Sequence, residues 1–376
     1  MSAVIKLYFY RKYAAIMYIH ERKDWPQFTW DAEAISAKLG PVRHRQGRIL
    51  GQMESLGFKV QEETMLRALT LDVVKSSEIE GELLNSEQVR SSIARRLGIE
   101  IAGTVPAERN VEGVVEMMLD ATQHYGKSLT AERLFDWHAA LFPTGRSGMY
   151  KIKVAGWRDG GMQVTSGPMG RETIHFDAPV SEKVPQEMTI FLEWMEKEQK
   201  LDAVLKAAIA HLWFVTIHPF DDGNGRIARA IADLQLARAD KSQQRFYSMS
   251  AQIQTERNIY YDILESTQKG DLDITPWLGW FLDCLMRSME QTDDTIGRTL
   301  ARARFWETHR DTELNTRQHK ILGMLLDDFF GKLHVAKYAA ITKTSTDTAL
   351  RDIRDLMKKG ILEQEGSGRS TSYRLK

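Results

Sequence analysis

The chain has 376 residues, more than one typical domain, which favours two or three domains. Hydrophobic residues make up 43% and charged residues 27%, the balance of an ordinary globular protein. Lysine plus arginine and aspartate plus glutamate each number 51, so no net charge draws the chain to nucleic acid or to a membrane, and any basic site must be local. The single cysteine, Cys284, excludes an internal disulfide and a multi-cysteine zinc site.

The first residues of the sequence are apolar, but Lys6, Arg11 and Lys12 interrupt them before the core of a signal peptide could form. The sequence also holds no run of about 18 apolar residues, the length that a membrane-spanning helix needs. We therefore expect a cytoplasmic protein with no membrane span.

The N-terminal part, residues 1–104, is predicted to be a helical extension. At 25–31 it contains WPQFTWD, where we expect the aromatic side chains to pin an extended segment onto a helical domain, with ligand stacking as the alternative. Residues 62–80 predict a helix, because apolar side chains recur at three- and four-residue steps. Gly81 follows this helix as its expected C-cap.

Residues 145–179 differ from their surroundings, because they are rich in glycine and contain short β-type runs. We expect a β-hairpin there, with the turn SGPMGR between its strands. The expected strand residues are Val164, Thr165 and Ser166 on one side and Thr173, Ile174 and His175 on the other. This is the only β-element expected before the last fifty residues, so the sequence predicts a mainly α-helical fold.

Further helices are predicted on both sides of this hairpin from the spacing of apolar residues. They cover 110–124, 130–141 with Thr130 as N-cap, 181–198, 203–217, a helix from about 226, 255–267 and 275–290. The helix at 203–217 is apolar nearly all round, which indicates burial in the core. Residues 105–295 are expected to form one catalytic domain.

The last part, residues 296–376, predicts two helices followed by two strands, the order of a winged-helix domain. Thr346 or Asp347 is the expected cap of the second helix, and the turn GSGRS joins the strands. Acidic residues alternate with the basic ones here, so we favour dimerisation or substrate docking over DNA binding. The basic residues are Arg351, Arg354, Lys358, Lys359 and Arg369.

The stretch richest in chemically active groups is HPFDDGNGRIAR, from His218 to Arg229. Pro219 biases His218 away from helical backbone, so the preceding helix should end there. Gly223 and Gly225 let backbone N–H groups turn around an anion at the start of the next helix, where the helix dipole also favours negative charge. The loop therefore predicts a phosphate-binding site.

Charged side chains complete this loop. Arg226 and Arg229 are three residues apart and project from one helix face, and guanidinium groups pair with phosphate oxygens. Asp222 beside bound phosphates indicates a Mg²⁺ ion, and His218 can accept a proton near neutral pH. These parts suit phosphoryl or nucleotidyl transfer, while the lack of a GxxxxGK[ST] motif argues against a P-loop enzyme.

This stretch resembles the motif of the Fic family, HxFx(D/E)GNGRxxR, at every specified position. The resemblance implies transfer of AMP from ATP to a hydroxyl of a target protein. His218 would deprotonate the target Ser, Thr or Tyr, and Asp222 would hold Mg²⁺ against the α- and β-phosphates. Phe220 would pack into the core and fix the loop.

The same resemblance assigns the phosphate contacts. Gly223, Asn224 and Gly225 would form the anion-binding nest. Arg226 would neutralise the leaving diphosphate, and Arg229 would neutralise the γ-phosphate.

The hairpin resembles the flap of the family, which pins the target chain beside the nucleotide by strand pairing. His175 is expected to be an ordinary flap side chain. Downstream, RNIYYDILESTQKGD resembles the segment that walls the adenine in relatives, with Tyr261 as the second tyrosine of a pair. Gln268 stands where some relatives carry asparagine.

An inhibitory element is implied upstream. SSEIEG fits the Fic inhibitory motif (S/T)xxxE(G/N), with Ser76 first, Glu80 as the acid and Gly81 last. The resemblance implies that Glu80 pairs with Arg229 and takes the place of the γ-phosphate. A solvated helix end is the alternative for Glu80.

The segments WPQFTWD and SSEIEGELLNSEQVRSSIARRLG also resemble the N-terminal extension of one Fic subgroup. The sequence thus predicts a three-part, mainly α-helical protein adenylyltransferase that uses ATP and Mg²⁺. Its expected partners are a target protein and, by resemblance, a second copy in a homodimer, with self-modification left open. The alternatives are an ATP-sensing regulator that binds DNA, and a Fic enzyme that uses another donor or removes AMP.

Overall fold

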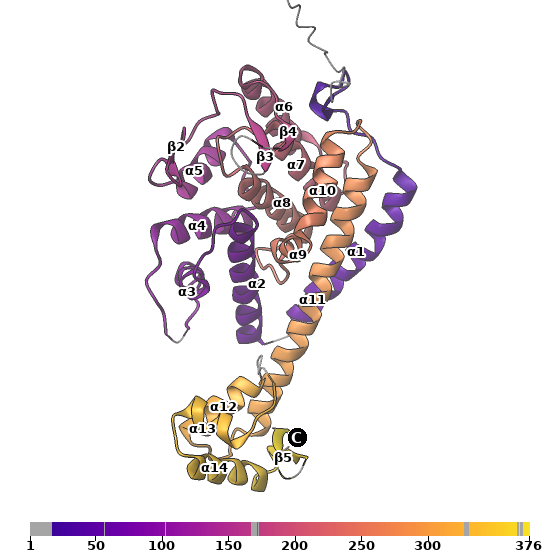
Figure 1. Ribbon diagram of the computed structural model, residues 1–376. Coiled ribbons are helices and arrows are strands. Elements are labelled where there is room, and N and C mark those ends of the chain that lie inside the picture. Colours follow the sequence, from indigo (N-terminus) through magenta and orange to yellow (C-terminus); the bar gives the residue numbers. More distant parts are fainter. Residues whose placement is uncertain are drawn as a thin grey trace, which may run out of the picture. The chain divides into compact units, whose positions relative to one another are not determined.

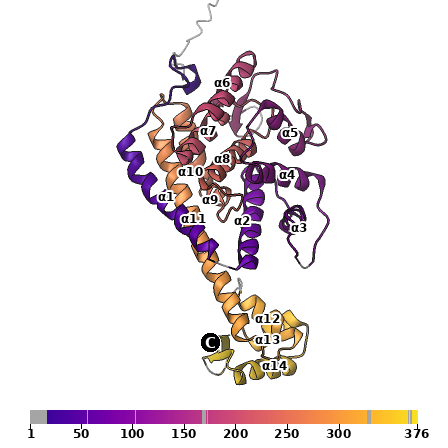
Figure 2. The ribbon, with the colours of Figure 1, turned by 180° about the vertical axis from the view of Figure 1, so that it is seen from behind.

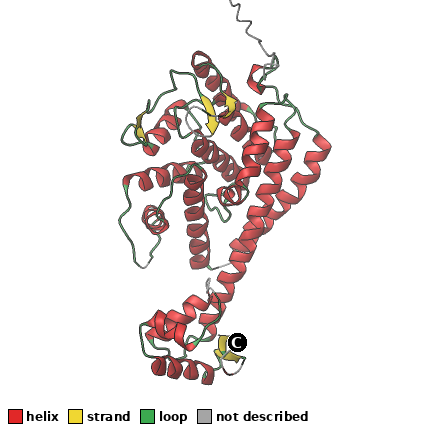
Figure 3. Ribbon diagram, viewed as in Figure 1, coloured by secondary structure: helices red, strands yellow, loops and turns green. Residues whose placement is uncertain are grey.

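The computed structural model describes residues 17–55, 57–101, 103–166, 171, 173–326, 331–366, 368 and 371–376. The chain divides into two compact units, one that ends at Thr292 and one that begins at Asp293. Helices dominate both units and the strands are few and short (Figure 3), so the predicted mainly α-helical class is confirmed. Within the described ranges, no helix is both long enough and apolar enough to cross a bilayer.

The N-terminal part of the first unit contributes a 3-10 helix and three α-helices. These are η1 (Ile19–Glu21), α1 (Ala32–Glu54), α2 (Phe58–Ile79) and α3 (Ser86–Leu97). Helix α2 ends with Glu80 as its C-cap, and Gly81 follows with a φ of 83°. Glycine adopts this left-handed conformation without the strain that a side chain would add, so it lets the chain turn sharply after Glu80.

The rest of the first unit is built around two central helices. Its helices are α4 (Arg109–Gln123), α5 (Ala131–Leu141), η2 (Ser181–Lys183), α6 (Val184–Lys197), α7 (Ala203–Ile217), α8 (Asn224–Asp240), α9 (Met249–Thr255), α10 (Arg257–Gln268) and α11 (Thr275–Thr308). Helices α7 and α8 lie side by side in both views (Figure 1, Figure 2) and pack against each other. Every residue of α7 from Val204 to Ile217 is buried, as its all-round apolar pattern predicted.

One helix was not predicted and another is longer than predicted. Helix α9 was not predicted; it begins after Ser248, whose hydroxyl accepts a hydrogen bond from the backbone N–H of Ala251. Helix α11 continues to Thr308, well past the predicted end at 290, and contains the boundary between the two units. No proline or glycine pair interrupts the sequence at 290, so no local signal ends the helix there.

In the described residues of the first unit, the named strands form two antiparallel pairs, beside one isolated parallel bridge between Thr29 and Asp273. A short pair, β1 (Arg146–Ser147) with β2 (Tyr150–Lys151), was not predicted separately. The predicted hairpin is formed by β3 (Gln163–Ser166) and β4 (Thr173–Asp177), with Thr165 opposite Ile174 and Ser166 opposite Thr173. Most of the expected SGPMGR turn lies outside the described residues.

The aromatic residues of WPQFTWD pack on helix α7. Trp25 and Phe28 contact each other edge to face with ring centroids 5.3 Å apart, and both contact Trp213, at 6.2 and 5.7 Å. Such edge-to-face contacts add to the area that aromatic rings bury. The cluster therefore fastens the N-terminal extension to the centre of the first unit.

In its described residues, the second unit contains the end of α11, three further helices and a hairpin around a core of their own. The further helices and the strands are α12 (Thr316–Leu326), α13 (Val335–Thr342), α14 (Thr346–Lys358), β5 (Leu362–Glu365) and β6 (Ser372–Leu375). The predicted cap of α14 was wrong, because Ser345 is the N-cap and accepts the backbone N–H of Thr348. Helix α13 was not predicted, and assignment to the winged-helix fold stays a prediction.

Two acidic side chains of α14 pair with basic residues of the second unit. Asp352 accepts hydrogen bonds from Arg317, and Asp355 pairs with Lys359 at 2.5 Å. Arg369, expected in the turn between the strands, lies outside the described residues. Arg351, Arg354 and Lys358 are exposed on the same helix, and DNA binding stays the less favoured prediction.

Candidate active site

The loop that joins α7 to α8 is held in an unusual backbone conformation at both ends. His218 is the C-cap of α7 with φ 52° and ψ 58°, a left-handed conformation that costs a non-glycine residue roughly 1 kcal/mol or more. Gly223 is the N-cap of α8 with φ 81°, and a Cβ placed there would lie 2.9 Å from the ring of Phe142. The sequence therefore needs glycine at 223 for both conformation and space.

The interior of the loop is tied together by Asn224 and Phe220. The Asn224 side-chain oxygen accepts the backbone N–H of Phe220 at 3.0 Å, and its amide nitrogen donates to the Phe220 carbonyl at 2.8 Å. Phe220 is fully buried and stacks on His138 with centroids 4.2 Å apart. Asn224 therefore shapes the loop with its side chain, and only its main chain is left to face an anion.

His218 is arranged as a neutral base. Its Nδ1 lies 3.1 Å from the Val215 carbonyl, so a proton on Nδ1 donates there and leaves Nε2 without a proton. Burial lowers the pKa of His218 below its ordinary value, and this outweighs the hydrogen bond to Val215, which raises it. The imidazole is therefore neutral at pH 7 and able to accept a proton.

Arg158 anchors this loop and was missed by sequence reasoning. Its Nε donates to the His218 carbonyl at 2.8 Å and its Nη1 to the Gly160 carbonyl at 2.7 Å, while Nη2 donates to the Pro179 carbonyl. The backbone N–H of Arg158 also donates to the Pro219 carbonyl at 2.9 Å. An arginine that is 2% exposed thus joins the loop between α7 and α8 to the segments on both sides of the β3–β4 hairpin.

Arg226 and Arg229 lie in the first turns of α8 and are 5% and 2% exposed. The Nε of Arg226 and the Nη1 of Arg229 are buried and have no hydrogen-bond partner in the part of the chain that the structure describes. Buried donors normally have acceptors, because an unpaired one costs about 1–3 kcal/mol. Two unpaired guanidinium N–H groups beside a helix N-terminus fit a site for an anion such as a nucleotide phosphate.

Glu80 contacts Arg229 as the sequence resemblance predicts. The Nη2 of Arg229 lies 2.7 Å from Glu80 Oε1, and the same guanidinium donates to the Oγ and the carbonyl of Ser76 at 2.9 and 2.8 Å. Burial works against the charged form of Arg229, but the Glu80 carboxylate outweighs it and raises the pKa. A Cβ at Gly225 would overlap the Glu80 carboxylate, so glycine lets this acid reach the start of α8.

A second acid, which sequence reasoning missed, contacts the other arginine. Glu82 Oε2 lies 2.5 Å from Nη1 of Arg226, and the Arg226 guanidinium also packs over the ring of Phe142 at 5.1 Å. The signal was present in the sequence, because Glu82 follows the inhibitory acid by two residues with only Gly81 between them. In the structure both motif arginines are therefore paired with acids of the same segment.

Asp222 is positioned by its neighbours. Its Oδ1 accepts the backbone N–H of Gly223 at 2.6 Å, and its Oδ2 accepts the hydroxyl of Ser147 at the end of β1. Among the described residues, no group of three metal-ligating side chains gathers there. One carboxylate beside a phosphate site suits Mg²⁺, which takes most of its other ligands from phosphate oxygens and water.

The structure brings Tyr261 to this site but does not bring the Gln268 side chain. The Tyr261 hydroxyl lies 3.4 Å from the Ile79 carbonyl, and neighbouring Glu80 and Arg229 both influence its pKa, which burial raises. Gln268 is 3% exposed, and its amide donates to the Thr216 hydroxyl at 3.2 Å, between α10 and α7. The expected adenine contact of Gln268 stays a prediction.

The predicted flap residues lie next to helix α10. His175 Nε2 is 2.6 Å from the Ser166 hydroxyl on the facing strand, and His175 Nδ1 is 2.6 Å from Glu265 Oε2. Val164 is partly buried against Phe176, whereas Ile174 is 45% exposed. His175 thus connects the hairpin to α10.

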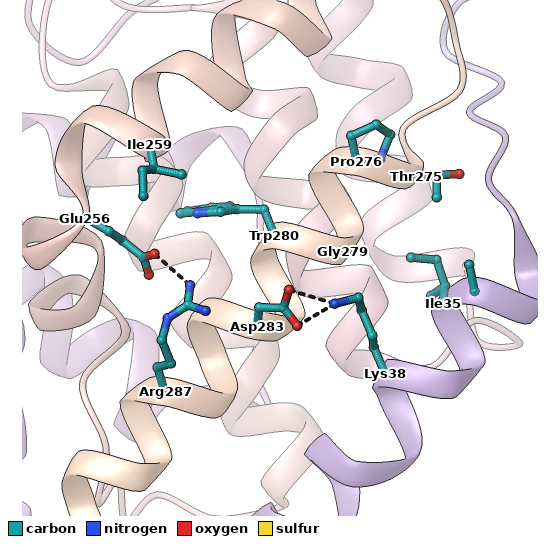
Figure 4. Close-up of a pocket in the computed structure, with 11 residues that line it drawn as sticks. Ile35, Lys38, Glu256, Ile259, Thr275, Pro276, Gly279, Trp280, Asp283 and Arg287 are labelled. Carbon is teal, nitrogen blue, oxygen red and sulfur yellow. Dashed lines mark hydrogen bonds and ion pairs between the residues drawn. The ribbon is translucent and has the colours of Figure 1, made fainter.

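A separate depression of about 620 Å³ lies between α1, α10 and α11 (Figure 4). Its charged residues pair with each other, Lys38 with Asp283 at 2.7 Å and Arg287 with Glu256 at 2.6 Å. No residue of the HPFDDGNGRIAR loop lines it. The depression is therefore not part of the candidate active site.

Two parts of the chain match known protein families. Residues 128–236 match the model described as Fic/DOC family, and residues 18–99 match the model described as Domain of unknown function (DUF4172). The chain therefore contains a domain of the Fic/DOC family.

Particular relatives match over part of their length. The chain is 35% identical over 105 residues to the Protein adenylyltransferase Fic of Culex quinquefasciatus, covering 27% of this chain and 19% of that protein. It is 32% identical over 114 residues to the protein of the same name from Nematostella vectensis, covering 30% of this chain and 25% of that one. The alignment thus spans about a fifth to a quarter of the length of these curated relatives.

The crystal structure of a Fic family protein from Desulfovibrio desulfuricans G20 is similar with a TM-score of 0.55 and 21% identity. The similarity covers 93% of this chain and 98% of that one. It supports the fold.

Proposed function

We propose that this chain is a protein adenylyltransferase, which transfers AMP from ATP to a Ser, Thr or Tyr hydroxyl of a target protein. The observation that carries the proposal is the pair of buried arginines, whose unpaired N–H groups lie beside a glycine-built helix N-terminus and a neutral histidine. The names of the relatives that match the Fic/DOC region support the same activity.

In the proposed reaction the target oxygen attacks the α-phosphorus of ATP, and the bond from that phosphorus to the bridging oxygen breaks. Diphosphate leaves, and the proton of the hydroxyl passes to Nε2 of His218. Arg226 would neutralise the leaving diphosphate and Arg229 the γ-phosphate, at the start of α8 where the helix dipole also favours negative charge. A Mg²⁺ ion held by Asp222 would offset the charge of the α- and β-phosphates.

The flap would hold the target chain beside the nucleotide by strand pairing along β3 or β4. Such pairing uses main-chain groups, so the target's side chains are not specified by the flap sequence. Arg158 would keep the flap and His218 in a fixed relation, because it bonds the carbonyls of both segments.

Glu80 would restrain the reaction. By pairing with Arg229 it takes the group that would receive the γ-phosphate, so ATP would bind with its α-phosphate turned away from attack. The resting protein is then expected to have low activity.

Incorporation of label from ATP labelled at the α-phosphate tests the proposal. Glu80→Gly should raise incorporation into protein by at least about tenfold. Loss of a Glu80–Arg229 contact that contributes more than ~1.4 kcal/mol gives that factor. His218→Ala in the same background should abolish incorporation. Labelling of a lysate would identify the target, and other labelled nucleotides would test the donor.

A folded Glu80→Gly protein that labels no protein, itself included, would contradict the proposed activity. Incorporation that persists in the Glu80→Gly, His218→Ala double variant would instead contradict the role of His218 as base.

A further inference from the structure

The turn that follows α2 places two acids against two arginines. Glu80 and Glu82 lie on either side of Gly81, and Arg226 and Arg229 project from the first turns of α8. Glu80 contacts Arg229 and Glu82 contacts Arg226. The two ion pairs therefore run in opposite order along the two segments, the first acid with the second arginine and the second acid with the first.

Backbone hydrogen bonds fix this turn. The N–H of Glu82 donates to the Ser77 carbonyl at 3.0 Å and the N–H of Gly81 to the Glu78 carbonyl at 3.0 Å, with Gly81 in the left-handed conformation. This is the pattern of a helix end closed by glycine. It directs the Glu82 side chain back toward α8, where Asn110 also lies 3.4 Å from its carboxylate.

The two partners of this ion pair differ in burial. The Arg226 side chain is 6% exposed and packs on Phe142, whereas the Glu82 side chain is 35% exposed and stands on a turn beside Leu83, which is 83% exposed. Glu82 can therefore move into solvent without unpacking the core, while Arg226 stays in place. After such a movement Arg226 would offer Nη1 and its unpaired Nε to an anion.

We propose that Glu82 is a specificity-determining residue that makes the resting site select nucleoside monophosphates over nucleoside di- and triphosphates. This inference rests on the proposed function, in which Arg226 receives the diphosphate part of the nucleotide. A nucleotide with a β-phosphate must displace Glu82 from Arg226. Displacing Glu82 costs free energy, and this cost weakens the binding of the di- or triphosphate. The same holds for any ligand that must shift an existing equilibrium between two states.

A monophosphate needs only the amide groups at the start of α8 and does not compete with Glu82. Glu80 occupies the arginine that would receive the γ-phosphate, and Glu82 occupies the arginine that would receive the β-phosphate. The effects of the two acids on nucleotide affinity can therefore be separated. Removal of Glu80 alone leaves Arg226 covered, and the nucleotide affinity of such a variant stays below what the loop can provide.

Calorimetric titration of the full chain with AMP, ADP and ATP tests this selectivity. Glu82→Gln should increase the affinity for ADP and ATP by at least about fivefold, because the β-phosphate gains a charged partner. The affinity for AMP, which has no β-phosphate, should change by less than about twofold. The same change in the Glu80→Gly background should again tighten ADP. Glu87→Gln, which removes one exposed acid from the first turn of α3, is the matched control and should leave all three affinities unchanged.

Unchanged relative affinities for AMP and ADP in folded Glu82→Gln would overturn the proposal. If that variant fails to fold, Glu82→Asp replaces it in the test. Aspartate keeps the charge but has a shorter side chain, so the affinity for ADP should also increase. Binding is measured without AMP transfer. A shift in ADP affinity together with no labelled protein would therefore support the role of Glu82 and contradict the proposed enzyme activity.

Discussion

Single residues at the start of α8 lie so close to Glu80 that an added side chain would not fit. Gly225 is the clearest case, because a Cβ there would meet the Glu80 carboxylate and lie 3.3 Å from Nη1 of Arg229. The backbone of Gly225 is ordinary helix, so the need for glycine comes from the approach of Glu80 and not from conformation. The same space would admit a phosphate to the helix N-terminus.

Gly225→Ala is expected to lower the free energy of unfolding by roughly 1–3 kcal/mol, since the added methyl displaces Glu80 from its partner. In the Glu80→Gly background the same substitution should be close to neutral, because the carboxylate is gone and alanine favours the helix. A double-mutant cycle by urea denaturation measures the difference. Equal costs in both backgrounds would show that the methyl group meets something other than Glu80.

The contiguous part of the site was predictable from the sequence, and the distant part was not. HPFDDGNGRIAR carries its base, glycines and arginines on one loop, so their proximity follows from chain connectivity alone. Arg158 and His138 reach the loop from other segments, and no local pattern indicates that they meet it. Glu82 is adjacent to a recognised motif, but the sequence does not indicate its partner. The structure shows that it lies 2.5 Å from Arg226.

At the scale of elements, the β3–β4 hairpin and the loop between α7 and α8 are joined by one buried arginine. The guanidinium of Arg158 serves the carbonyls of His218, Gly160 and Pro179 together. A planar group with several donors can do this, whereas an ammonium group at the end of a flexible chain cannot reach all three. The flap strands were predicted from their β-type residues, but this connection could not be.

Arg158→Lys should therefore lower the free energy of unfolding by about 2 kcal/mol, because buried carbonyls lose their donors. In the Glu80→Gly background it should also reduce AMP incorporation, as the flap and His218 lose their fixed relation. Thermal unfolding and label incorporation measure the two effects, with exposed Arg109→Lys as the control. Incorporation equal to that of the control would remove Arg158 from the positioning of the site.

At the scale of the whole molecule, buried neutral histidines make stability depend on pH. His138 is fully buried against Phe220, and burial lowers its pKa to about 4. The pKa of a histidine in the unfolded chain is about 6.5, so between pH 4 and 6.5 the unfolded chain binds more protons than the folded one. The contribution of His138 is complete above pH 6.5 and is lost as the pH falls towards 4.

The free energy of unfolding is thus expected to fall between pH 6.5 and 4, with His138 contributing on the order of 3 kcal/mol. His138→Gln removes this titration, so its unfolding free energy should fall less steeply over the same range. Denaturant titrations at a series of pH values give the two slopes. Parallel slopes would mean that His138 is charged in the folded protein.

The first unit also contains both partners of the Glu80–Arg229 contact, since α2 and α8 belong to the same compact unit of one chain. Glu80 should therefore act on the arginine of its own molecule. In the proposed function, Glu80 is the group that restrains the reaction.

The initial rate of α-phosphate incorporation into protein, compared between Glu80→Gly and Glu78→Gly, tests this claim most directly. Both substitutions remove an acid from the end of α2, but Glu78 pairs with Lys75 at 2.6 Å and does not contact the motif arginines. The predicted result is a strong increase for Glu80→Gly and a rate near that of the unaltered chain for Glu78→Gly. Equal rates for the two variants, both folded, would contradict the account.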